Sequence, residues 1–410
     1  MNIKTLVDNL KADEVRNDNV LHITANEAQL SKTARLFLGS KLSERYYFGE
    51  GTNGIVDFHP FTGMSIDSVT DLVTAAKDAA KEMLGASVIN LNVLSGVHAM
   101  MCSLLSTTEP GDMVMTVPAE AGGHFATASI LQRVGRKHIY ATYDFENLKF
   151  DVEKIAEDYR KSGAKAFYID VSYYLNPHNL TEIRAALGDA AILIYDASHT
   201  MGLILGQQFQ APLKEGANVI SANTHKTLFG PQKGMIAFRD EEFGQKANEI
   251  IDGCLYSSPH THHVIALAIA LLELKEFGRD YATQVVKNSN AVAEAFVKRG
   301  YDVRKSNTGR YTENHQSHIF IDDKGERLDL YKKLLNNNIS SNFDSALGDR
   351  IYIRFGTQEI TRRGMNEAEM ENIAELVDGA LKGKDVKDEV IAFNKKFTTI
   401  GYSFDSQLGL

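Results

Sequence analysis

The chain has 410 residues, 43% of them hydrophobic, which is enough to bury a large core and to form more than one domain. Lys and Arg number 44 against 53 Asp and Glu, and the formal net charge of −9 argues against nucleic acid or an anionic membrane as the main partner. The two cysteines, Cys102 and Cys254, lie far apart, so neither a disulfide framework nor a C-x-x-C metal pair is expected.

The N-terminal residues and the apolar runs bear on where the protein works. Residues 1–10 mix apolar with charged side chains and lack the apolar centre of a signal peptide. The longest apolar stretch, residues 264–272, is far shorter than a membrane span. Together with the sparse cysteines, these features predict a soluble protein of the cytoplasm.

Between residues 66 and 300, short apolar runs alternate with helical patterns. Continuous apolar runs are typical of strands that helices cover on both faces. Strands are predicted at residues 88–93, 113–117, 137–141, 166–171, 191–196, 219–223 and 235–238. Helices are predicted at residues 66–84, 97–105, 125–134 and 152–162. This order predicts an α/β fold around a mostly parallel, doubly wound sheet of seven strands.

A second, smaller unit follows a long helix predicted from residue 261 to residue 277. Residues 317–321 and 350–354 have strand patterns, whereas residues 328–336 and 367–381 have helical ones. We therefore expect a large domain over residues 66–279 and a smaller C-terminal α+β domain over residues 280–410.

Polar side chains follow three of the predicted strands. Ser172 comes after one strand, Asp196 and His199 come after the next, and His225 with Lys226 after a third. Ligands of open α/β sheets bind beyond the carboxyl ends of the strands, so these side chains are the first candidates for a site.

Lys226 and Asp196 together fit the chemistry of pyridoxal phosphate (PLP). A lysine directly after an apolar strand must desolvate its amine or bond it covalently, and a Schiff-base lysine needs a desolvated amine. A carboxylate such as that of Asp196 could keep the pyridine nitrogen protonated, which makes the ring an electron sink. On spacing alone, an equally good interpretation is that Lys226 extends to solvent and Asp196 caps a helix.

Longer motifs favour the first interpretation. The segments Asp196-Ala-Ser-His-Thr-Met-Gly-Leu and Asn223-Thr-His-Lys-Thr-Leu-Phe-Gly-Pro-Gln-Lys-Gly-Met-Ile resemble the serine hydroxymethyltransferase family. Three more segments match that family in the same order: Thr24-Ala-Asn-Glu27, Ala121-Gly-Gly-His124 and Arg354-Phe-Gly-Thr-Gln-Glu-Ile-Thr-Arg-Arg-Gly-Met. The resemblance runs from about Thr24 to Leu381 and implies a PLP enzyme of fold type I, like aspartate aminotransferase.

The resemblance also implies residue roles. Lys226 should carry the cofactor as a Schiff base, and Asp196 should pair with its pyridine nitrogen. His124 should stack on the ring face. Ser172 and His199 should lie near the ring hydroxyl group.

Further roles concern the phosphate, the substrate and the partner subunit. Ser95 and Gly96, at the start of a predicted helix, should hold the phosphate together with His225. Arg354 should bind the substrate carboxylate through its forked guanidinium group. The family builds its site across a homodimer, so residues 1–65 should contribute to the dimer and the active site, with Tyr46 reaching the neighbouring cofactor.

Departures from the hydroxymethyltransferase pattern bear on the reaction. Asn26 stands where the family has a serine that touches the substrate carboxylate. Reading on without gaps, Tyr46 keeps the family's tyrosine, but Phe48 takes the place of the glutamate that handles the one-carbon unit. Glu50 is nearby and could substitute for that glutamate. The family also has a Gly-Gly pair that receives the cofactor phosphate from the partner subunit, and this sequence has Ser258-Pro259 at that place.

Three histidines in the segment 259–263 raise the question of a metal. Ligands at such close spacing rarely all point one way, so a polar helix start at the subunit interface is the favoured interpretation, and no metal site is predicted.

Other segments resemble the L-threonine transaldolase branch more closely. They are Ser198-His-Thr-Met-Gly-Leu-Ile-Leu-Gly, Gly230-Pro-Gln-Lys-Gly, Phe277-Gly-Arg-Asp-Tyr-Ala and Thr361-Arg-Arg-Gly-Met. That branch cleaves threonine to acetaldehyde and a glycine carbanion, which then adds to another aldehyde. The resemblance therefore implies a folate-independent enzyme acting on the Cα–Cβ bond of a β-hydroxy amino acid.

Several alternatives stay open. The chain could be a hydroxymethyltransferase that uses tetrahydrofolate, or another PLP enzyme that forms carbon–carbon bonds in biosynthesis. It could also be a binding or scaffold subunit, although the intact Lys226 and Asp196 speak against that. The proton-transferring base could be His124, His199, Glu50 or water.

Overall fold

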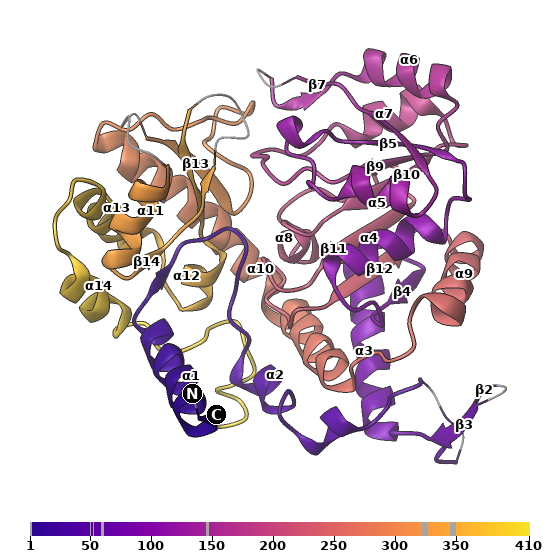
Figure 1. Ribbon diagram of the computed structural model, residues 1–410, viewed down its shortest axis with the longest axis horizontal. Helices are drawn as coiled ribbons and strands as arrows, with labels where there is room; N and C mark the ends of the chain where they lie inside the picture. Colours follow the sequence, from indigo (N-terminus) through magenta and orange to yellow (C-terminus); the bar gives the residue numbers. More distant parts are fainter. Residues whose placement is uncertain are drawn as a thin grey trace. The chain divides into compact units, whose positions relative to one another are not determined.

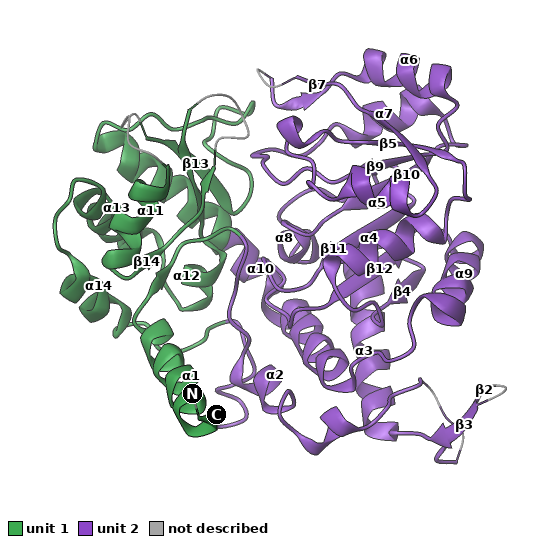
Figure 2. Ribbon diagram, viewed as in Figure 1, with its two compact units in different colours: residues 1–25, 284–401 green, residues 26–283, 402–410 purple. Residues whose placement is uncertain are grey.

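The computed structural model describes residues 2–49, 51, 53–58, 61–144, 147–321, 327–344 and 350–410. The chain divides into two compact units, shown in Figure 2. Unit 1 comprises residues 1–25 and 284–401, and unit 2 comprises residues 26–283 and 402–410. The second boundary, between residues 283 and 284, lies close to the expected one at 279–280. The expected N-terminal segment of 65 residues, however, is shared between the two units.

Unit 2 is built on a seven-stranded sheet with the strand order β4-β12-β11-β10-β9-β5-β6 (Figure 1). The pairs β11–β10, β10–β9, β9–β5 and β5–β6 are parallel, and β12 is antiparallel to both neighbours. The prediction of a mostly parallel sheet of seven strands is thus confirmed. The strands are β4 Val88–Asn90, β5 Met113–Thr116, β6 Lys137–Tyr140, β9 Ala166–Ile169, β10 Ile192–Asp196, β11 Val219–Asn223 and β12 Gly234–Phe238.

Alternate residues of these strands form one apolar core. Val114, Tyr168, Ile194 and Ile236 pack in a cluster with apolar residues of three helices. The period of two places all four on one face of the sheet. The helices on this face are α4 Gly96–Leu105, α5 Thr127–Arg133 and α9 Glu241–Ile250.

Helix α3, Asp67–Leu84, shows how the sequence sets a boundary in this unit. Its buried Val69, Val73, Ala76 and Ala80 recur every three or four residues, which gives the helix one apolar stripe. It ends at Gly85, whose φ of 67° is a left-handed conformation that glycine adopts without strain.

Helix α10 runs from Thr261 to Lys298, well beyond the predicted end at residue 277. Gly278, the residue after the predicted end, does not terminate the helix. It is a site of close packing instead. Its main-chain carbonyl lies so near α8, Met201–Leu205, that a Cβ on Gly206 would come within 2.4 Å of the oxygen. A local sequence pattern does not reveal such a tertiary contact.

Unit 1 contains the three-stranded antiparallel sheet β13-β16-β15 and the parallel pair β1–β14. Ile319, Ile353 and Phe355 lie on the face of the sheet that packs on a core with Met370 and Val377 of α13. Helix α13 begins with a capping box in which Asn366 and Glu369 satisfy each other's backbone N–H groups.

Further helices and strands complete each unit. Those of unit 1 are α1 Ile3–Asp18, β1 Leu21–His22, β13 Gln316–Phe320, α11 Arg327–Asn336, β14 Ile339–Ser340, β15 Phe343–Asp344, β16 Tyr352–Gly356, α12 Gln358–Arg362, α13 Glu367–Leu381 and α14 Lys387–Asn394. Those of unit 2 are α2 Lys32–Leu36, β2 Ile55–Phe58, β3 Phe61–Met64, β7 Tyr143–Asp144, β8 Lys149–Phe150, α6 Val152–Ser162 and α7 Leu180–Leu187. Among the described residues, no helix is both long and apolar enough to span a membrane.

Candidate active site

A cavity of about 250 Å³ lies in unit 2, beside the carboxyl ends of β9, β10 and β11 and the start of α4. Parallel strands deliver the side chains that follow them to this edge of the sheet. The cavity collects eight of the residues predicted from the sequence: Ser95, Gly96, His124, Ser172, Asp196, His199, His225 and Lys226.

Lys226 follows β11 and lies against His199, with 3.0 Å between the lysine Nζ and the imidazole Nε2. The backbone around this pair is fixed, because the hydroxyl of Thr227 donates a hydrogen bond of 2.8 Å to the carbonyl of His199. The same hydroxyl accepts the N–H of Gly202 at 3.1 Å. The amine and the imidazole are therefore held together by two strand ends that are adjacent in the sheet.

Asp196, the last residue of β10, is oriented by two donors. The hydroxyl of Tyr168 donates to one carboxylate oxygen at 2.6 Å, and the N–H of Ser198 donates to the other at 2.8 Å. Since a carboxylate has about four acceptor positions, each oxygen keeps capacity for a further donor in the cavity.

His124 lines the cavity from the turn that precedes α5. Burial lowers the pKa of its imidazole, and the positive charge of Lys226 lowers it further, against an opposing effect of Asp196. A neutral ring suits both stacking on a flat ligand and accepting a proton.

The start of α4 forms the opposite wall. The side chain of Ser95 caps the helix by accepting the N–H of His98 at 3.1 Å. A Cβ on Gly96 would meet the Cβ of Asn223 at 2.8 Å, so the strand and the helix approach as closely as they do because this residue is glycine. His225 completes the wall, and burial followed by the charge of Lys226 lowers the pKa of its imidazole to about 4. A helix start with free N–H groups is a favourable place for a phosphate.

Three predicted residues of the described chain do not line this cavity, and a fourth lies outside the described residues. Tyr46 is 57% exposed, and its ring stacks on Phe48 with 5.1 Å between centroids. Asn26 is half-buried at the start of unit 2. Arg354 is buried in β16 of unit 1, and Glu50 lies outside the described residues. The roles expected of all four stay predictions.

The segment with three histidines begins helix α10 at Thr261. The carbonyl of Pro259, just before it, accepts a hydrogen bond of 2.7 Å from the buried amine of Lys233. The rings of His262 and His263 lie 4.3 Å apart and tilted. In the part of the chain that the structure describes, no three His, Cys, Asp or Glu side chains are grouped as a metal ion would require.

Sequence reasoning did not assign a role to three polar residues of the cavity, Asp170, Ser198 and Asn223. Asp170 and Asn223 stand at strand ends, which is the signal that identified Asp196. Ser198 follows Asp196 by two residues, and its hydroxyl accepts the N–H of Asn223 at 3.0 Å. Spacing alone does not tell which strand-end residues face a ligand.

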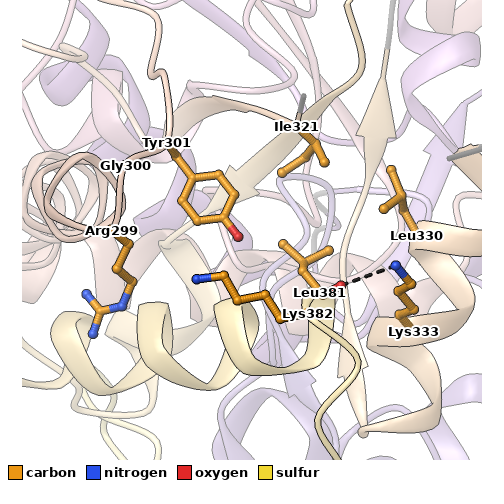
Figure 3. A pocket seen from close by; sticks show the side chains of 8 residues that line it. All are labelled: Arg299, Gly300, Tyr301, Ile321, Leu330, Lys333, Leu381 and Lys382. Carbon is orange, nitrogen blue, oxygen red and sulfur yellow. Dashed lines mark hydrogen bonds between the residues drawn. The ribbon is translucent and has the colours of Figure 1, made fainter. Parts of the chain in front are cut away.

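A larger pocket, of about 490 Å³, lies within unit 1 and contains none of the predicted residues (Figure 3). Its cationic side chains are already engaged. Arg299 pairs with Glu371 at 2.7 Å and Lys382 with Asp378 at 2.8 Å. Figure 3 shows the amine of Lys333 directed at a main-chain carbonyl, 3.2 Å away. The candidate catalytic and cofactor-binding side chains therefore lie in the smaller cavity of unit 2.

The residues of that cavity fit PLP. Lys226 would supply the amine for a covalent link, and the fixed carboxylate of Asp196 would face the pyridine nitrogen. The start of α4 would receive the phosphate beside Gly96, a glycine that the close packing requires. His124 supplies an aromatic face.

Comparisons with known proteins agree with this fit. The profile of the family described as "Serine hydroxymethyltransferase" matches residues 2–377. A fluorothreonine transaldolase from Streptantibioticus cattleyicolor is 36% identical over 389 residues, which are 92% of this chain but only 59% of that protein. A serine hydroxymethyltransferase from Methanosphaera stadtmanae is 34% identical over 399 residues, covering 94% of this chain and 92% of the relative.

Among solved structures, the L-threonine transaldolase from Pseudomonas fluorescens, in its internal aldimine state, is similar along the whole chain. The TM-score is 0.91 at 29% identity, and the match covers 99% of this chain and 94% of that one. The likeness confirms the expected PLP fold of type I. With the family match over most of the sequence, it means that this chain belongs to the serine hydroxymethyltransferase family and is a PLP-dependent transferase.

Proposed function

We propose that the enzyme is a folate-independent transaldolase: it cleaves the Cα–Cβ bond of L-threonine or a similar β-hydroxy amino acid and transfers the glycine unit to a second aldehyde. The observation that carries the proposal is Phe48, which stands where hydroxymethyltransferases have the glutamate that handles the one-carbon unit. Phe48 packs between two aromatic rings, with centroid distances of 5.1 Å to Tyr46 and 4.5 Å to Phe61. An aromatic cluster offers no carboxylate for folate chemistry.

The similarity to two transaldolases supports the same proposal. One is the fluorothreonine transaldolase, and the other is the L-threonine transaldolase of known structure. Hydroxymethyltransferases are nearly as similar in sequence, at 34% identity, so folate-dependent serine cleavage is the second candidate.

When bound, PLP supplies an electron sink for the bond that breaks at Cα. The protein's own groups hold the reactants and move the protons. Asp196 is held by Tyr168 and Ser198 in an orientation fixed before any ligand enters. Arg354 is proposed to hold the substrate carboxylate. The substrate hydroxyl loses its proton to a base, the Cα–Cβ bond breaks, and acetaldehyde leaves.

His199 and His124 are the two imidazoles proposed as that base. His199 lies 3.0 Å from the Lys226 amine, so a proton can pass between these groups directly. His124 has a lowered pKa because of burial and is therefore neutral and able to accept a proton at neutral pH. Both line the cavity beside Asp196.

The test is turnover of L-threonine by the PLP-loaded enzyme without any folate. We expect acetaldehyde to form, as measured by a coupled alcohol dehydrogenase assay. With an added aromatic aldehyde, we expect a new β-hydroxy-α-amino acid, identified by mass spectrometry. Retro-aldol cleavage needs only the imine, a base and the electron sink, so no further co-substrate is required.

A parallel reaction with L-serine and tetrahydrofolate discriminates the second candidate. If serine is converted to glycine only when tetrahydrofolate is present, and no aldehyde exchange occurs, the transaldolase proposal is wrong. Glu50 would then be the residue to replace, and Glu50→Gln should abolish the folate-dependent reaction. Phe48→Tyr is a matched control, because it keeps the aromatic packing and should leave threonine turnover within a few-fold of the wild type.

We further propose a homodimer whose active sites are shared, with Tyr46 acting on the partner's cofactor. Tyr46 is exposed in the single chain, and its hydroxyl lies 3.4 Å from that of Ser258. Mixing Lys226→Ala with Tyr46→Phe subunits should restore part of the activity that each variant lacks, because one hybrid site then has both residues. Activity no higher than the sum of the two parent variants would count against shared sites.

A further inference from the structure

Asp170 is a carboxyl group in the wall of the PLP cavity, just after β9, and no role has been assigned to it so far. It is 3% exposed. One carboxyl oxygen, Oδ2, accepts the hydroxyl of Thr127 at 2.5 Å and the main-chain N–H of His124 at 3.3 Å. The other, Oδ1, is buried and has no hydrogen-bond partner among the described residues.

These two hydrogen bonds fasten the turn that carries His124. The turn is also held on its other side, where the N–H of Ser172 donates to the carbonyl of Gly122 at 2.7 Å. Its middle residue, Gly123, packs so closely that a Cβ would come within 2.1 Å of the carbonyl oxygen of Val117. The residues that follow β9 therefore hold the turn through two sets of hydrogen bonds, one to Asp170 and one from Ser172. The bond to Asp170 is the one made by His124 itself.

The surroundings of Asp170 disfavour a negative charge. Asp196, on the neighbouring strand β10, is the charged group that acts on it, and Tyr168 is the titratable group on its own strand. Burial is the main cause that raises the pKa of the Asp170 carboxyl to about 7, the charge of Asp196 adds to this, and the hydrogen bond from Thr127 opposes it. An ionised Asp170 would place negative charge on Oδ1, which is buried without a hydrogen-bond donor, and this also disfavours the charged form.

We propose that Asp170 is a positioning residue whose uncharged carboxyl group holds His124 against the cofactor ring. Asp196 is then the one carboxylate of this wall that bears a charge for the pyridine nitrogen. The inference rests on PLP as cofactor and does not depend on which aldehyde or amino acid the enzyme uses. It assigns two neighbouring carboxyl groups different protonation states because Asp170 is more deeply buried than Asp196 and because their hydrogen-bond partners differ.

Three variants test the role through the affinity for PLP and the visible circular dichroism of the bound cofactor. Asp170→Asn keeps an accepting oxygen and cannot ionise, so both signals should match the wild type. Asp170→Ala removes both hydrogen bonds and should raise the dissociation constant of PLP by about tenfold and weaken the dichroism. Thr127→Val removes one donor but leaves the bond to His124, and its effect should lie between the two.

The pH dependence of stability tests the uncharged state without any activity. A carboxyl group whose pKa is about 7 in the folded chain, against a usual value of 3.8, keeps its proton on folding while the unfolded chain loses it. The wild type should therefore lose stability relative to Asp170→Asn as the pH rises from about 4 to 7, by up to about tenfold per pH unit in the folding equilibrium. Far-ultraviolet circular dichroism in urea at pH 5 and pH 7.5 measures this difference.

Three results would overturn the proposal. If Asp170→Asn loses PLP affinity as Asp170→Ala does, or if its stability relative to the wild type does not change with pH, the carboxyl group works as an anion. If Asp170→Ala binds PLP with wild-type affinity and dichroism, the residue does not position His124. None of these results concerns folate or aldehyde exchange, so a failure here is distinct from a failure of the transaldolase proposal.

Discussion

Replacing Lys226 by alanine is expected to lower the rate of threonine cleavage by at least roughly 10³-fold, while the protein still folds. The side chain is half-buried at the cavity wall, with its amine 3.0 Å from His199. The visible band of the covalently bound cofactor should disappear, since no other amine lines the cavity in the described part of the chain.

Peptide mapping after borohydride reduction of the wild type gives an independent test. The reduced cofactor should be found on the peptide that contains Lys226. Lys233 is the informative comparison, because it lies only seven residues further on and burial lowers the pKa of its amine to about 7. Its Nζ, however, donates to the carbonyl of Pro259 at 2.7 Å and does not line the cavity. A label on Lys233 would contradict the assignment.

A second variant separates the covalent link from the positive charge. Lys226→Arg keeps a cation next to His199 but cannot form the link. We expect it to be as inactive as the alanine variant. Appreciable activity would mean that the charge, and not the bond, is what the reaction needs.

The sheet was predictable because most of its strands are buried on both faces and therefore have short apolar runs as their sequences. All seven predicted runs contain strands of the central sheet, from β4 at Val88–Asn90 to β12 at Gly234–Phe238. The C-terminal end of α10 was not predictable, since the helix continues through Gly278, which packs against Gly206, the residue directly after α8. Long-range packing of this kind leaves no periodic signal.

The cavity was predictable in part for a related reason. Parallel strands bring the residues that follow them to one edge, so Asp196 and Lys226 could be expected to meet. The sequence does not show, however, which strand-end carboxyl group is charged. Asp170 and Asp196 stand at the ends of neighbouring strands and differ in two ways. Asp170 is 3% exposed, whereas Asp196 is half-buried. Asp170 accepts a hydroxyl and one N–H on a single oxygen, whereas Asp196 has donors on both oxygens.

Changing Asp196 to asparagine is expected to slow carbon–carbon bond cleavage by roughly 10³-fold and to leave PLP partly bound. The asparagine oxygen can still accept the N–H of Ser198, and its amide group can donate to the hydroxyl of Tyr168, which can in turn donate to Ser221 at 3.1 Å. The wall therefore keeps its shape and loses only the charge. A neutral pyridine withdraws electrons poorly, so the chemical step should suffer more than binding.

Single-turnover cleavage of threonine and exchange of the glycine α-proton with deuterium measure that step directly. Tyr168→Phe is the matched control, because it removes the hydrogen bond of 2.6 Å to Asp196 and leaves the carboxylate charged. We expect a loss of only about three- to tenfold for it, the usual worth of one hydrogen bond. If Asp196→Asn stayed within a few-fold of the wild type in both assays, the negative charge at β10 would not be what makes the cofactor an electron sink, and another group would have to hold the pyridine nitrogen.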